Sequence, residues 1–195
     1  GLCATLAFAL TQSQVASEER DRAFALATRN SAVTEFLGML ITEAAEADKP
    51  VTVSDMLARS EKLALADTSG NPESRAAVLR TIGLHYLAWG NRGKAAAILE
   101  RALAVLGDEP AHGLHAEVLC AHALAISGMG RANEAAANID RELSQPPANR
   151  ASFAECLKAR SVVAGTLDDA AGSLLYAREA LQQLRQSGPI SNEQE

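Results

Sequence analysis

Three histidines and a cysteine, His112, His115, Cys120 and His122, are the residues in this chain whose types and spacing best suit chemistry. On a helix, His115 and His122 fall on one side with His112 nearby, and three imidazoles could bind zinc. Zinc sites normally bring a fourth ligand, or a carboxylate behind the histidines. We therefore expect no metal and no cofactor, and we expect His122 to pack between helices.

Two further groups of residues invite a chemical interpretation. Cys120 and Cys156 lie near equivalent points of successive helices, where an oxidising compartment would allow them to pair. Neighbouring helix axes lie about 8–10 Å apart, whereas a disulfide needs Cα atoms within about 7 Å. We therefore expect two buried free thiols. Asp168 and Asp169 are expected to stabilise the start of a helix through its dipole rather than to act as catalysts.

Catalytic and nucleic-acid-binding signatures are absent from the sequence. It contains no G-x-G-x-x-G loop, no His-Arg-Asp or Asp-Phe-Gly, no G-x-S-x-G and no His-Glu-x-x-His. The formal net charge is −6 and the basic residues are scattered singly. Nucleic-acid binders rely on clustered basic residues to neutralise phosphates. These observations predict a protein that is not an enzyme and does not bind nucleic acid.

The composition predicts an all-α fold. Alanine, leucine, glutamate and arginine are abundant, and no window of alternating β-branched residues is present. Apolar residues three and four apart predict a helix over 31–47. Thr52 and Asp55 have the spacing of a capping box before a second helix. Asn71 followed by Pro72 predicts the start of a third.

Similar units then recur along the chain. Gly90, Gly130 and Gly165 are each expected to end a helix, and the units are 40 and 35 residues apart. An alanine follows each glycine by five residues, and Leu or Ile follows by nine: Ala95 and Leu99, Ala135 and Ile139, Ala170 and Leu174. Such a period indicates helix hairpins that stack because each is too small to bury its own apolar face.

The units resemble the tetratricopeptide repeat. The first has Leu79-x₂-Ile82-Gly83-x₂-Tyr86 and then Ala95-x₃-Leu99. Weaker matches are Leu119-x₂-His122-Ala123-x₂-Ile126 with Ala135-x₃-Ile139, and Ala154-x₂-Leu157-Lys158-x₂-Ser161 with Ala170-x₃-Leu174-x₂-Ala177. The resemblance implies a right-handed α-solenoid with three repeats over about 74–107, 112–145 and 150–186. A long N-terminal helix and a helix pair over 13–73 would precede them, and 188–195 would form a tail.

The whole chain is similar to the C-terminal sensor region of bacterial membrane-anchored serine/threonine protein kinases, through "AVTEFLGMLITEAAEA" and "TVSDMLARSEKLA" followed by the repeats. That resemblance implies a sensor on the periplasmic side of a membrane. Two interpretations of the uncharged residues 1–12 remain open: the end of a transmembrane helix, or a buried helix start. The alternatives for the whole chain are a cytoplasmic adaptor or regulator region and a self-association scaffold.

In tetratricopeptide arrays the concave face comes from the first helix of each repeat, and the resemblance implies that a protein or peptide binds there. The residues expected on it are Arg80, Leu84, Leu87, Cys120, Leu124, Glu155, Ala159 and Val162. Because most of them are apolar, we expect a groove for a helix or an extended segment rather than a carboxylate clamp. The alternative is that the chain's own C-terminal helix or a second copy, in a homodimer, covers this face.

Overall fold

A computed structural model describes residues 52–66, 71–107, 113–145 and 150–186, together with five isolated helical positions between 27 and 38. Over these residues the chain is helix and turn without strands, so the predicted all-α class is confirmed. Residues 1–12, most of the helix expected over 31–47, the tail and His112 lie outside this part of the chain.

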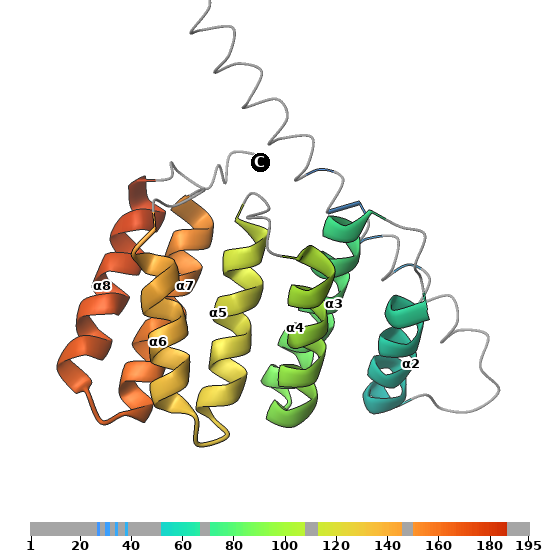
Figure 1. Ribbon diagram of the computed structural model, residues 1–195, viewed down its shortest axis with the longest axis horizontal. Helices are drawn as coiled ribbons and strands as arrows, with labels where there is room; N and C mark the ends of the chain where they lie inside the picture. Colours follow the sequence, from blue (N-terminus) through green and yellow to red (C-terminus); the bar gives the residue numbers. More distant parts are fainter. Residues whose placement is uncertain are drawn as a thin grey trace, which may run out of the picture.

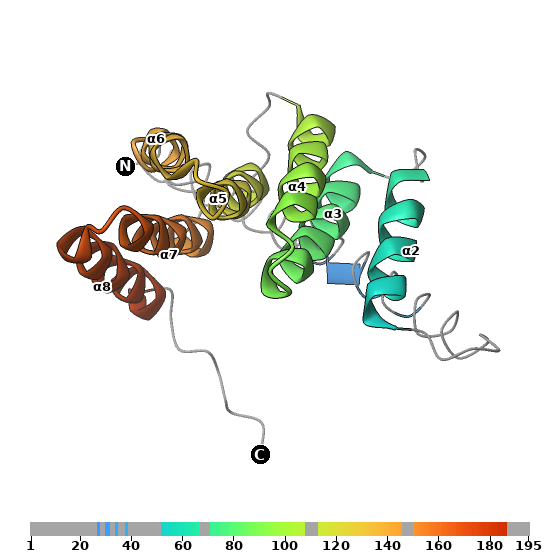
Figure 2. The same ribbon diagram turned by 90° about the horizontal axis from the view of Figure 1, so that it is seen from below.

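The described helices extend across the molecule from α2 on one side to α8 on the other (Figure 1). They are α2 (Val53–Ala66), α3 (Pro72–Ala88), α4 (Arg92–Leu106), α5 (Leu114–Ser127), α6 (Ala132–Leu143), α7 (Arg150–Thr166) and α8 (Ala170–Gln186). Helices α3 and α4, α5 and α6, and α7 and α8 form three hairpins. The first begins two residues before the range expected for it, at Pro72, and the other two lie within their expected ranges. The first helix of each later hairpin contacts both helices of the hairpin before it (Figure 2).

Side-chain caps begin the helices where the sequence predicts them. Before α2, the backbone N–H of Thr52 donates to Oδ2 of Asp55 at 3.1 Å, and the N–H of Asp55 donates to Oγ1 of Thr52 at 3.2 Å. The Thr52 hydroxyl also donates to this carboxylate and lowers the pKa of Asp55. Before α3, Oδ1 of Asn71 accepts from the N–H of Glu73 at 2.8 Å, with Pro72 in the first turn. Both predicted caps are confirmed.

The turns inside the hairpins correct the predicted register of the third unit. Gly90, Gly130 and Asp168 have φ of 74°, 85° and 60°, and each lies two residues before the second helix of its hairpin. Gly165 lies inside α7 and does not end it. Aspartate tolerates this left-handed conformation, so the turn needs no glycine. The units are therefore 40 and 38 residues apart, not 40 and 35.

This correction changes which residues of the third hairpin are equivalent to those of the first two. Seven residues before the left-handed turn come Gly83, Ala123 and Ser161, and five residues after it come Ala95, Ala135 and Ser173. The positions of Leu99 and Ile139 are taken by Ala177, not by Leu174. Leu174 is 52% exposed, whereas Leu99 and Ile139 are fully buried.

Asp169 supports its expected role at the start of α8. Its Oδ1 accepts a hydrogen bond of 2.8 Å from the backbone N–H of Gly172. A carboxylate at this position satisfies a free N–H group and interacts favourably with the helix dipole. The two aspartates thus shape the turn and the cap of the third hairpin.

Close packing holds the first hairpin together. A Cβ on Gly83 would lie 2.6 Å from Cγ of Leu99, so only glycine allows α3 and α4 to approach as they do. Leu79 and Ile82 complete this core at 1% exposure each. A second cluster, around Ile126 of α5, joins α5, α6 and α7. Helix α5 is buried almost all round because it contacts α3, α4, α6 and α7.

Candidate binding face on the first helices

One apolar position recurs on the first helix of every hairpin. Leu84, Leu124 and Val162 each lie six residues before the left-handed turn, on α3, α5 and α7. Leu84 and Leu124 are half-buried and pack against the two core clusters, whereas Val162 is 53% exposed. We refer to these three residues as the apolar row.

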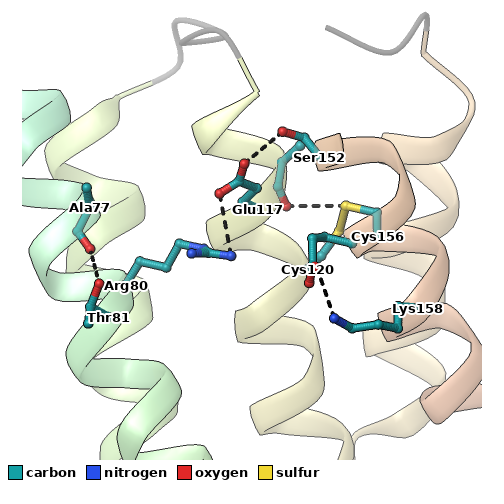
Figure 3. A network of polar contacts seen from close by, with 10 residues as sticks. Ala77, Arg80, Thr81, Glu117, Cys120, Ser152, Cys156 and Lys158 are labelled. Atoms are coloured by element: carbon teal, nitrogen blue, oxygen red, sulfur yellow. Dashed lines mark hydrogen bonds and ion pairs between the residues drawn. A yellow bond between two sulfur atoms is a disulfide. The ribbon is translucent and has the colours of Figure 1, made fainter. Parts of the chain in front are cut away.

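Polar side chains earlier on the same helices link the three first helices. Nη2 of Arg80 on α3 lies 3.4 Å from Oε2 of Glu117 on α5, and their side chains are 17% and 11% exposed. The hydroxyl of Ser152 on α7 donates to Oε1 of the same Glu117 at 2.9 Å. Figure 3 shows Arg80 and Ser152 directed at Glu117 from opposite sides. Because Glu117 binds both neighbours, Arg80 fixes the arrangement of the hairpins rather than offering a free charge to a ligand.

Two of the charged residues on α7 are exposed and paired with each other. Nζ of Lys158 lies 2.9 Å from Oε1 of Glu155, and the two side chains are 62% and 44% exposed. Exposed ion pairs of this kind contribute little to stability, about 0–1 kcal/mol. They remain available to exchange partners with an incoming chain, beside the exposed Val162.

A disulfide joins the second and third hairpins, and the expectation of two free thiols is wrong. Cys120 of α5 and Cys156 of α7 are bonded, with Cα atoms 5.2 Å apart and both residues buried (Figure 3). The expectation compared the distance between helix axes with a limit that applies to the distance between Cα atoms. Cα atoms lie about 2.3 Å from their axis, so facing Cα atoms of helices about 8–10 Å apart are separated by only about 3.4–5.4 Å.

Burial divides the eight residues expected on the binding face. Cys120 and Ala159 are each 2% exposed, packed between α5 and α7, so the expectation that they contact a ligand is wrong. The residues with exposed surface are Arg80, Leu84, Leu87, Leu124, Glu155 and Val162. Lys158 was missed by the sequence analysis. With the corrected register Lys158 is equivalent to Arg80, because each lies ten residues before the left-handed turn. The correct alignment of the repeats would therefore have predicted it.

The histidines do not form a metal site in the described part of the chain. No group of three or more His, Cys, Asp or Glu side chains there could hold a metal ion. His122 is half-buried on α5, and burial lowers its pKa, opposed by the neighbouring Glu100. A histidine kept neutral between helices agrees with the packing role expected for it.

Comparison with protein-family models, curated proteins and solved structures gives no significant match for this chain. Among the described helices, none has both the length and the apolar character needed to cross a membrane.

Proposed function

We propose that the chain is a tetratricopeptide-like array, a right-handed α-solenoid of three helix hairpins, that binds a protein or peptide on the face formed by α3, α5 and α7. Two features support this architecture. Each later hairpin stacks its first helix on both helices of the previous one, and the small residues Gly83, Ala123 and Ser161 recur at one offset from the left-handed turn. Neighbour-to-neighbour stacking of equivalent units defines a solenoid.

The apolar row is the observation that carries the binding proposal. Three equivalent apolar side chains lie on successive first helices, and the third, Val162, is 53% exposed. The charged residues four positions before Leu84 and Val162 are already paired, Arg80 with Glu117 and Lys158 with Glu155. An apolar row between paired charges suits an apolar segment, helical or extended, better than a terminal carboxylate.

We further propose that the array is the periplasmic sensor region of a bacterial membrane-anchored serine/threonine kinase. The buried Cys120–Cys156 disulfide supports an extracytoplasmic position, because structural disulfides persist in oxidising compartments and are rare in the cytoplasm. It weighs against the alternative of a cytoplasmic adaptor. The catalytic activity would then belong to another part of the kinase.

Selection from a displayed library of random dodecapeptides, followed by calorimetry with the best binder, tests the binding proposal. Val162→Glu should lower the affinity for that peptide by about tenfold or more, since a charge would replace an apolar contact. Leu175→Glu is the matched control, because Leu175 is 63% exposed on α8, outside the row. Equal affinities of the two variants would contradict the proposed face.

A further inference from the structure

Helix α8 exposes a ladder of apolar side chains. Leu174, Leu181 and Leu184 are 52%, 54% and 46% exposed. Together with Ala170 and Ala177 they follow spacings of four and three residues, which place them on one stripe of the helix. We refer to the three leucines as the α8 ladder. Contiguous apolar side chains exposed in this way mark an interaction surface.

The corrected register shows what covers the positions of the α8 ladder in the second helices of the other two hairpins, α4 and α6. Leu174 and Leu181 lie four and eleven residues after the first residue of α8. In α4 the equivalent residues are Ala96 and Leu103, and in α6 they are Ala136 and Leu143. All four pack within the two core clusters, which include residues of α5 and α7, the first helices of the following hairpins. The ladder thus occupies positions that a further helix covers in the other hairpins.

The charges beside the ladder indicate what kind of helix would cover it. Arg178 and Arg185 lie four residues after Leu174 and Leu181, along one edge of the ladder. Both are exposed, and neither has an ion-pair partner among the described residues. The acidic residue of α8, Glu179, follows Arg178 directly and so points about 100° away around the helix. A second copy would place four arginines along one seam, which disfavours α8 pairing with itself.

We propose that the α8 ladder docks an amphipathic helix of a partner protein, in the position that α5 and α7 take on α4 and α6. This helix presents leucine-like side chains to the ladder and acidic side chains, about two turns apart, to Arg178 and Arg185. The surface is separate from the apolar row, which lies on α3, α5 and α7. The array therefore has two binding surfaces, one along its first helices and one on α8.

The proposal is tested with two synthetic 18-residue helical peptides, each fluorescein-labelled and with leucines alternately three and four apart. One carries glutamates seven apart beside the leucines, and the other carries lysines there. By fluorescence polarisation with the full chain, the glutamate peptide should bind about tenfold tighter or more. Leu181→Glu should reduce its affinity by about tenfold, with Leu184→Glu as a second variant and circular dichroism to verify the fold. Leu175→Glu is the control, on α8 but outside the ladder.

Charge reversal gives the decisive result. The Arg178→Glu, Arg185→Glu double variant should prefer the lysine peptide, because only complementary charge at the ladder edge predicts a reversal. Three results of the peptide experiments would overturn the proposal: no binding of the glutamate peptide, equal loss in Leu175→Glu and Leu181→Glu, or no reversal of preference. A concentration-dependent dimer that Leu181→Glu abolishes, measured by sedimentation, would overturn it in favour of a second copy. None of these results affects the Val162 test.

Discussion

The first and third hairpins share one backbone plan and fill it with different side chains. In the first, α3 and α4 interlock through Gly83 and Leu99, and Leu99 is fully buried. In the third, the equivalent small residues are Ser161 and Ser173, and the hydroxyl of Ser161 donates to the carbonyl of Ser173 at 2.8 Å. Apolar interlocking is replaced by a hydrogen bond between helices.

The difference extends to the second helices. Helix α4 lies between α3 and α5 and buries Ala95, Ile98, Leu99 and Ala102. Helix α8 packs mainly against α7, and only Ala180 is fully buried. A residue of equal hydrophobicity therefore contributes very differently to stability in the two helices, because burial depends on what packs outside the hairpin.

The largest expected difference comes from the leucines that the sequence makes equivalent. Leu99 and Leu174 both lie nine residues after a glycine, Gly90 or Gly165. Leu99→Ala should lower the free energy of unfolding by about 2–5 kcal/mol, since it removes a buried side chain and leaves a cavity. Leu174→Ala should stay within about 0.5 kcal/mol, as is usual for exposed sites. Urea denaturation measures both, and similar losses would mean that the corrected register is wrong.

The joints between hairpins differ as well. The first and second hairpins are linked by the Arg80–Glu117 ion pair, whereas the second and third share the Cys120–Cys156 disulfide, which closes a loop of 36 residues. A loop of that length corresponds to about 4 kcal/mol of chain entropy. Replacing both cysteines by alanine should cost about 2–4 kcal/mol in urea denaturation.

Cys3 is replaced by serine both in the double alanine variant and in the disulfide-bonded protein it is compared with, so that no third thiol can exchange. A second comparison uses the protein with Cys120 and Cys156 intact, unfolded and reduced with dithiothreitol. Its stability is compared with that of the disulfide-bonded protein. Sγ of Cys156 lies 3.4 Å from the carbonyl oxygen of Ala116, an acceptor that the reduced thiol could use. The reduced protein should therefore lose somewhat less stability than the alanine variant. No loss in either would indicate that the two thiols are not bonded in solution.

The smallest expected effect concerns pH and the middle hairpin. Burial lowers the pKa of His122 below its ordinary value of 6.5. The unfolded chain then binds a proton more readily than the folded one, so stability is undiminished above pH 6.5 and falls as the pH drops below it. Between pH 7.5 and 5.5, wild type should lose more thermal stability than His122→Gln. Identical pH profiles would contradict a histidine held neutral by packing.

The sequence by itself determined the helical class, the caps and the division into hairpins. These depend on local chemistry: Thr52 with Asp55, and Asn71 with Pro72, act within one turn of chain. The period of the first two hairpins was also readable, because Gly90 and Gly130 both take the left-handed turn.

Only the tertiary structure decided the third register, the disulfide and the exposed surfaces. The left-handed turn after α7 lies at Asp168, three residues after the glycine that was expected to end the helix. Cys120 and Cys156 meet because α5 and α7 pack face to face, which no local pattern encodes. Leu99 and Leu174 differ in burial for the same reason. Whether an apolar stripe becomes core or binding surface depends on the neighbouring helix, and that neighbour is fixed by long-range packing.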